Sequence, residues 1–165
     1  MEFLIKNLII LAITINVCMA AKNPLLAVPF FKDKSKMCEL KADFLYLSKL
    51  EKSDAKKVVG LEIDSIVKKI KMNCGGGHSF AYILSNRIRT EYQTVVVWIK
   101  DKVINEVKIL RFDEPERFKA PQKWLDQFKG KSLNEIAKVD GITGATLTAN
   151  SIKKLAKEGV YFETK

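Results

Sequence analysis

Three apolar, β-branched segments in close succession constrain the fold of this chain more than any other feature. Residues Ser79–Leu84, Tyr92–Lys100 and Val103–Phe112 are rich in Val, Ile and aromatic side chains, which favour strands. Only Asp101 and Lys102 separate the last two segments, so we expect a hairpin there. Strands that follow one another without intervening helices favour an antiparallel meander over a doubly wound parallel sheet.

The remaining patterns add one helix and two strands before these segments and a helix after them. Residues Ile66–Met72 alternate with period two, and Leu40–Leu47 is a further strand candidate. Ser53 as an N-cap and Gly60 as a stop predict a short helix between them, and the apolar spacing within Leu147–Ala156 predicts a C-terminal helix. The sequence therefore predicts a single α+β domain, in which an antiparallel β-sheet meander packs against helices.

The first twenty residues have the pattern of a secretory signal. Lys6 precedes the apolar run Leu8–Val17, and small residues stand at the third and first places before a cut after Ala20. The run is shorter than the roughly 20 apolar residues that span a bilayer. We therefore expect residues 1–20 to be a signal peptide and the protein to be periplasmic or otherwise extracytoplasmic. An uncleaved signal, which would leave the protein membrane-anchored, and lipidation of Cys18 are the alternatives, although Val17 is bulky for the residue before a lipidated cysteine.

Beyond the signal, the chain divides by pattern into a lead-in and a main domain, and it is strongly basic. Residues 21–63 form the expected lead-in with a short strand and helix, and residues 64–165 form the main domain. The formal net charge is +10, but no basic helix interleaved with aromatic residues is present, so nucleic acid is not an expected partner. Such a charge favours an acidic redox protein or an anionic membrane surface.

Removal of the signal leaves two of the three cysteines, Cys38 and Cys74. A disulfide between them would close a loop of about 37 residues and stabilise the fold by roughly 3 to 4 kcal/mol. Free thiols are one alternative, and a metal site that also includes His78 is another, although these residues fall short of a zinc-binding pattern. A thiol oxidoreductase is a weak hypothesis, because no Cys-x-x-Cys pair lowers a thiol pKa.

The segment Asp140–Thr146 reads Asp-Gly-Ile-Thr-Gly-Ala-Thr, and its residue types are compatible with a hydroxyl that attacks a phosphoryl group. Gly144 and Ala145 leave the backbone open around the Thr146 hydroxyl. Asp140 suits orienting a metal or accepting the hydroxyl proton, since phosphoryl transfer depends on positioning and charge neutralisation. The predicted helix that follows favours a phosphate at its N-terminus. A turn leading into that helix, with Thr146 or Thr148 as N-cap, is the alternative structural interpretation.

This segment resembles the attachment site of the FMN-binding domain family, whose pattern is Asp-x-x-Ser/Thr-Gly-Ala-Thr. The family includes flavinylated extracytoplasmic subunits of the sodium-translocating NADH:quinone oxidoreductase and of the Rnf complex. The resemblance implies that a flavin transferase uses FAD to place FMN on the Thr146 hydroxyl through a phosphoester bond. It extends over about Ile66–Leu155: Glu114 matches a Glu after the last long strand, and Trp124–Lys131 is similar to a Phe-x-x-Gln-Phe-x-Gly-Lys segment. The residues expected around the flavin are Asp140, Gly141, Thr143, Gly144, Ala145, Thr146, Leu147, Thr148 and Glu114.

These expectations favour an electron carrier over a stand-alone enzyme. The only histidine is His78, and no acid and base set for substrate chemistry stands out. The resemblance implies covalent FMN, residues 64–165 as the FMN-binding domain, and electron relay between a membrane redox complex and an extracytoplasmic acceptor. The alternative, from a different functional class, is an exported basic binding module without flavin. Bound flavin discriminates between the two.

Overall fold

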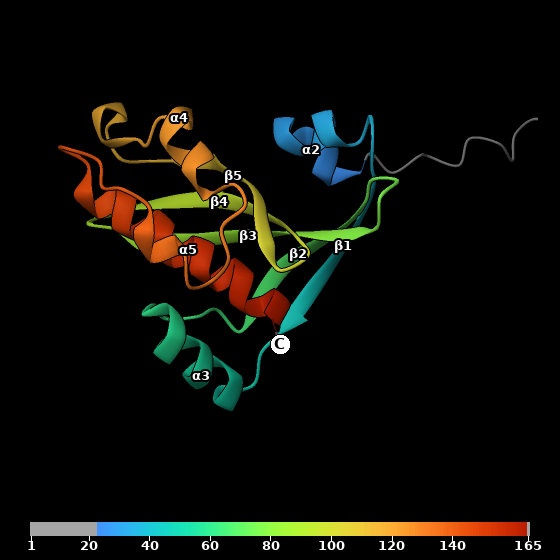
Figure 1. Ribbon diagram of the computed structural model, residues 1–165, viewed down its shortest axis with the longest axis horizontal. Coiled ribbons are helices and arrows are strands. Elements are labelled where there is room, and N and C mark those ends of the chain that lie inside the picture. The colour runs from blue at the N-terminus through green and yellow to red at the C-terminus, as the bar shows by residue number, and fades with distance from the viewer. Residues whose placement is uncertain (1–22, 165) are drawn as a thin grey trace, which may run out of the picture.

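The computed structural model describes residues 23–164 and contains a five-stranded antiparallel sheet with the strands in sequence order (Figure 1). The predicted signal peptide, residues 1–20, and Cys18 lie outside the described residues. The strands are β1 (Glu39–Tyr46), β2 (Ile66–Asn73), β3 (His78–Ile88), β4 (Glu91–Lys100) and β5 (Val103–Phe112). The helices are α2 (Pro29–Lys34), α3 (Lys49–Val59), α4 (Gln122–Leu125) and α5 (Thr146–Thr164), with 3-10 turns at Pro24–Ala27, Glu116–Phe118, Asp126–Phe128 and Ile136–Lys138. The α+β prediction, with a meander packed against helices, is confirmed.

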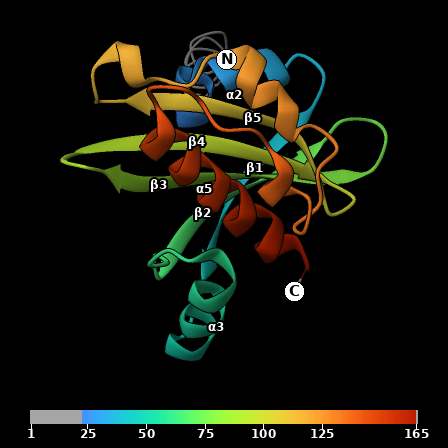
Figure 2. The ribbon, with the colours of Figure 1, turned by 60° about the vertical axis from the view of Figure 1, so that its left-hand side comes forward.

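Helix α5 crosses one face of the sheet and forms the main core with it (Figure 2). On β4, Val95 and Val97 point to this face, because successive side chains on a strand point to opposite sides. Their neighbour Val96 points to the other face, where Phe30 and Phe31 of α2 cover it. The sheet is thus sandwiched between the long C-terminal helix and a small N-terminal cap.

The turn between β4 and β5 follows from its sequence, and a disulfide joins the chain next to β1 and β2. Asp101 and Lys102 both have positive φ, 53° and 63°, as the two central residues of a tight hairpin require. The predicted hairpin between β4 and β5 is therefore present. Cys38 and Cys74 extend the register of β1 and β2 by one residue beyond Glu39 and Asn73, and a disulfide joins them. Because the disulfide uses both sulfur atoms, neither cysteine is available as a thiolate ligand for a metal.

Helix α3 begins earlier than predicted. The expected N-cap was Ser53, but the helix begins at Lys49, with Ser48 as its N-cap. The Ser48 hydroxyl accepts from the Glu51 N–H, and the Glu51 carboxylate accepts from the Ser48 N–H, which makes a capping box. Gly60 ends the helix in the left-handed conformation, as predicted. Within residues 23–164, no helix is both long and apolar enough to cross a membrane.

Candidate functional site

The Asp140–Thr146 segment is the loop that leads into α5. Gly144 has φ +79°, a left-handed conformation that glycine adopts without strain, and open space surrounds the position of a Cβ there. The first helical hydrogen bond runs from the Ala149 N–H to the Ala145 carbonyl, so Ala145 occupies the N-cap position. The interpretation of Thr146 or Thr148 as N-cap is therefore wrong, and Ala145 has no side-chain oxygen with which to cap the helix. Thr146 is the first helical residue, and it is exposed.

The backbone of this loop is fixed from two sides. The Trp124 indole N–H donates to the Asp140 carbonyl at 3.1 Å, and the Asp140 N–H donates to the Gln127 side-chain carbonyl at 3.3 Å. Lys153, about two turns into α5, donates to the Val139 carbonyl. The segment before the attachment motif thus positions the loop, while the Asp140 side chain itself is exposed.

Trp124 and Phe128 belong to the core. Trp124 is 6% exposed and Phe128 is fully buried, and their rings meet edge to face with centroids 5.2 Å apart. Trp124 has a second role that the sequence did not suggest, because its indole N–H holds the attachment loop in place.

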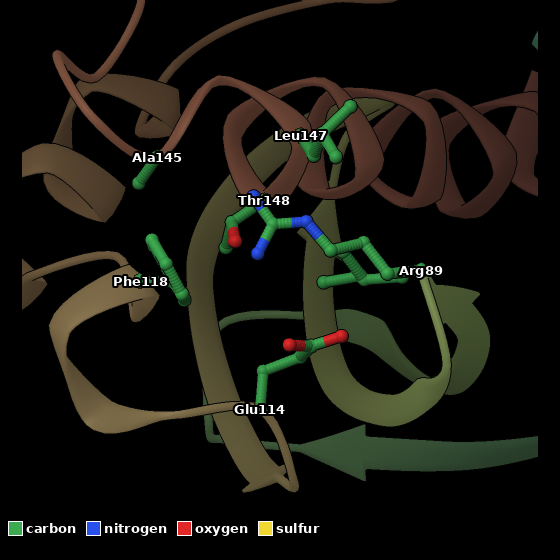
Figure 3. A pocket seen from close by; sticks show the side chains of 7 residues that line it. Arg89, Glu114, Phe118, Ala145, Leu147 and Thr148 are labelled. Atoms are coloured by element: carbon green, nitrogen blue, oxygen red, sulfur yellow. The ribbon is translucent and has the colours of Figure 1, made fainter.

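A small hollow lies beside the start of α5 (Figure 3). Three segments that are distant in the sequence enclose it: the β3–β4 turn, the chain just after β5, and the first turn of α5. Its lining comprises Ile88, Arg89, Glu114, Phe118, Ala145, Leu147 and Thr148. Its volume of about 10 Å³ is close to the space that one water molecule needs, so an isoalloxazine ring would have to displace a side chain to enter it.

Glu114 is the unusual group in this lining. Its side chain is 9% exposed, and one carboxylate oxygen, Oε1, has no hydrogen-bond partner among the described residues. A buried polar atom without a partner costs free energy, and in native proteins such an atom calls for an explanation such as a ligand. Glu114 was predicted to be near the flavin, and the structure brings it to the same hollow as Ala145, Leu147 and Thr148.

Arg89 and Phe118 line the same hollow and were not predicted. Arg89 stands in the β3–β4 turn with φ +48°, and its guanidinium carbon lies 4.5 Å from the centre of the Phe118 ring, a cation–π contact. No ion pair or hydrogen bond among residues 23–164 joins Arg89 to Glu114. The sequence could have pointed to Arg89 only through its place in the turn between β3 and β4. For Phe118, the sequence offers only its position four residues after Glu114.

Behind the first turns of α5, a polar network crosses from helix to sheet. Asn86 and Gln93 both donate to the Ser151 hydroxyl, and Gln93 also donates to the Asn86 side-chain carbonyl at 3.1 Å. Gln93 is fully buried, and its Oε1 has no partner among the described residues. Gln93 stands at a core-facing position of the alternating pattern in β4, and a polar residue at such a position is the sequence signal for this network. It was not among the predicted site residues.

The other predicted site residues lie on the loop rather than in the hollow. Gly141, Thr143 and Gly144 lie at the surface before the helix, as does Asp140. The Cys38–Cys74 disulfide is at the end of the β1–β2 pair and contributes nothing to this lining.

The fold and the site define a small α+β domain that presents an exposed hydroxyl at a helix N-terminus, beside a buried carboxylate. A model of the FMN-binding domain family matches residues 92–160, which run from the start of β4 through most of α5 and include Glu114, Trp124 and the Asp140–Thr146 loop. Residues 92–160 therefore match the FMN-binding domain family, and this match supports binding of FMN. No curated protein and no solved structure matches the chain.

The residues present are suited to FMN. An exposed hydroxyl stands at Thr146, and the first N–H groups of a helix have no intrahelical partners and favour a phosphate. The Oε1 of Glu114 accepts a hydrogen bond from any flavin or ribityl donor that reaches it. Phe118 lies in the same lining, and the guanidinium groups of Arg89 and Arg117 both contact its ring.

Proposed function

We propose that the protein is an exported electron carrier that holds FMN covalently through a phosphoester bond to Thr146. The observation that carries this proposal is the position of Thr146, an exposed hydroxyl on the first residue of a 19-residue helix, directly after an open Gly-Ala pair. When bound, FMN supplies the redox chemistry, and the protein determines its exposure and local charge.

The attachment reaction balances with FAD as the donor. The Thr146 Oγ attacks the phosphorus atom on the FMN side of the FAD pyrophosphate. A new phosphoester O–P bond forms, the P–O bond to the AMP phosphate breaks, and AMP leaves with the electron pair. The hydroxyl proton passes to a base, for which the exposed Asp140 carboxylate of the same loop is the candidate in this chain. Open space around Gly144 allows a flavin transferase to approach.

The covalent bond suits an exported protein, because outside the cytoplasm a dissociated flavin would not be replaced. We propose that the carrier passes electrons from a membrane donor to an extracytoplasmic acceptor. Its formal net charge of +10 favours encounter with an acidic redox protein or an anionic membrane surface.

The test is the intact mass of the protein purified from cells that co-express a flavin transferase. We expect an increment of FMN less one water on the parent protein and none on Thr146→Val. Thr164→Val is the matched control, because it removes an exposed hydroxyl at the other end of the same helix and leaves Thr146 and its loop in place. The same spectrum reports whether the chain is cut after Ala20. An increment that persists in Thr146→Val, or that is missing from the parent, contradicts the proposal; the second result favours a basic binding module without flavin.

A further inference from the structure

Strand β1 is an edge of the sheet that is open on both of its faces. Among the described strands it pairs with β2 alone, and Figure 1 shows it at the margin of the molecule. None of its eight residues is buried, and the side chains of Phe44 and Tyr46 are 49% and 69% exposed. Such an edge presents unpaired backbone donors and acceptors to which another strand can add.

The backbone groups at this free edge belong to the even-numbered residues of β1. The Leu47 N–H, directly after the strand, donates to the Ser65 carbonyl at 2.9 Å, so the odd-numbered residues turn their N–H and C=O groups toward β2. The Phe44 N–H points the other way and donates to the neighbouring Asp43 carboxylate at 2.8 Å. A strand that adds to this edge must therefore pair with the even-numbered residues.

The charged side chains on the α5 face of β1 alternate in sign and are unpaired within residues 23–164. Glu39, Lys41 and Asp43 occupy successive positions on this face, and none of them takes part in an ion pair with a described residue. Lys41 lies directly opposite Lys71 of β2. Like charges in that position destabilise a strand pair, so a negative group on the open side of Lys41 would be stabilising.

A second copy of β1 supplies that group in one antiparallel register. When Ala42 lies opposite Ala42 of the second copy, Lys41 lies opposite Asp43 of the second copy, and the two-fold axis repeats this ion pair. An axis through Lys41 or through Asp43 would instead place two identical charges opposite each other. We propose that the protein forms a homodimer in which two β1 strands pair in the register centred on Ala42 and join the two sheets into one.

The same register satisfies the backbone and the opposite face of the strand. Even-numbered residues meet even-numbered residues, so Leu40 exchanges backbone hydrogen bonds with Phe44 of the second copy. The Phe44 N–H then passes from the Asp43 carboxylate to a backbone carbonyl, which frees that carboxylate for Lys41 of the second copy. Lys41 and Asp43 form a pair without backbone hydrogen bonds, the kind in which side chains lie closest. On the α2 face, the exposed Phe44 ring gains an apolar neighbour in Leu40.

This dimer leaves the attachment loop open. Strand β1 lies outside residues 92–160, which match the FMN-binding domain family. Glu163, near the C-terminal end of α5, forms an ion pair with Lys69, which lies opposite Asp43 in the sheet. Thr146 begins the same helix at its other end. Both Thr146 hydroxyls of the dimer are therefore far from the joined edges, and the inference is independent of flavin attachment.

The experiment measures the dissociation constant of the dimer by sedimentation equilibrium, on protein purified with and without a co-expressed flavin transferase. Salt at about 0.15 M limits the repulsion between two chains of formal net charge +10. We expect the parent to dimerise with a Kd below about 0.1 mM. Asp43→Lys and Lys41→Glu each place like charges opposite each other at both symmetric positions, so each should raise the Kd at least about tenfold.

The decisive sample is an equal mixture of these two variants. In a mixed dimer, the introduced Glu of one chain lies opposite the introduced Lys of the other, and the remaining Asp43 lies opposite the remaining Lys41. The mixture should therefore associate as the parent does. Glu39→Lys is the matched control, because it makes the same change of charge on the same face of β1 but lies opposite Leu45 of the second copy. It should leave the Kd unchanged.

The possible outcomes are distinct from those of the proposed function. A parent that stays monomeric overturns the inference and favours an unlike chain as the partner of this edge. A dimer that resists both single variants uses another surface and also overturns it, as does a mixture that fails to associate while circular dichroism shows both variants folded. Intact mass of the same samples reports flavin: a flavin-loaded monomer overturns the dimer alone, and a dimer that takes up no flavin overturns the proposed function alone.

Discussion

Helix α5 approaches β4 so closely at Gly159 that the smallest added side chain should destabilise the fold. A Cβ built on Gly159 would lie 3.1 Å from both Cβ and Cγ1 of Val97 and 3.3 Å from Cδ1 of Ile99. Both neighbours belong to the buried core, and the two shortest contacts are to the stiff β-branched part of Val97. Gly159→Ala gains about 1 kcal/mol of helix propensity but overpacks the interface at a cost of roughly 1 to 3 kcal/mol. We therefore expect the free energy of unfolding to fall by up to about 2 kcal/mol.

A double-mutant cycle isolates this contact. Val97→Ala alone should cost about 2 kcal/mol, since it empties a fully buried position. Val97→Ala removes the contact of the added methyl group with Cγ1 but keeps the contact with Cβ, so the double variant relieves only part of the overpacking. The two changes together should therefore cost less than their sum by roughly 0.5 to 1.5 kcal/mol. Urea unfolding monitored by circular dichroism gives all four free energies, provided that the m-values agree.

Gly141→Ala is the matched control for the cycle. No heavy atom lies within 4 Å of a Cβ at Gly141, and its φ is outside the left-handed region. This substitution should be neutral or stabilising by less than about 1 kcal/mol. The reasoning is refuted if Gly159→Ala is stabilising by the full propensity gain and shows no coupling to Val97→Ala.

Two further predictions concern the attachment loop and the pH dependence of stability. Trp124→Phe keeps the aromatic packing but removes the hydrogen bond to the Asp140 carbonyl. It should lower the free energy of unfolding, measured by urea unfolding, by about 1 to 2 kcal/mol. It should also slow flavin attachment, which a time course of intact mass measures. Burial raises the pKa of the Glu158 carboxyl to about 8 from an ordinary value of 4.5, so the folded state binds the extra proton between these values. Its contribution to stability is complete below about pH 4.5 and is lost as the pH rises through about 8, by up to about 1.4 kcal/mol per pH unit. Glu158→Gln should remove this part of the slope in unfolding free energies measured from about pH 5 to about pH 9; an unchanged slope would contradict it.

The sheet was predictable from the sequence because its strands carry their own signal. Val103–Phe112 begins and ends in the structure as predicted, and the two-residue turn before it fixes the pairing with β4. The C-terminal part of β3 was not predictable from composition. The strand continues through Ser-Asn-Arg to Ile88 because each of these residues pairs with β4, for example Asn86 with Gln93. Its partner, rather than its own propensity, sets that boundary.

The start of α3 shows how two local signals compete. Ser48 and Ser53 both qualify as N-caps, and the apolar residues of the helix other than Leu50 lie after Ser53. In the structure Ser48 is the N-cap, and its reciprocal hydrogen bonds with Glu51 satisfy the backbone N–H groups of both residues. The Ser-x-x-Glu spacing was readable in the sequence and would have given the correct boundary.

The candidate site divides in the same way between local and long-range information. The attachment loop is continuous in the sequence, so its composition alone indicated an exposed hydroxyl at a helix start, as the structure has it. The hollow depends instead on three segments that the meander brings to one end of the sheet. Arg89 and Phe118 are 29 positions apart in the numbering, and only the folded β3–β4 hairpin brings the guanidinium over the ring. No pattern within either segment could have predicted that contact.

The proposed attachment of FMN at Thr146 would meet two demands on an electron carrier. Electron transfer requires the flavin to be close to the protein surface, whereas a flavin held only by an exposed bond would have no defined orientation. Thr146 lies at the surface, and the adjoining hollow is too small to bury a ring, which favours surface exposure of the flavin. In the proposed function, the bond to Thr146 would retain the cofactor, while the Trp124 indole, through its hydrogen bond to the Asp140 carbonyl, would hold the loop that carries it. Trp124→Phe and Thr146→Val would then separate the positioning of the loop from the attachment itself.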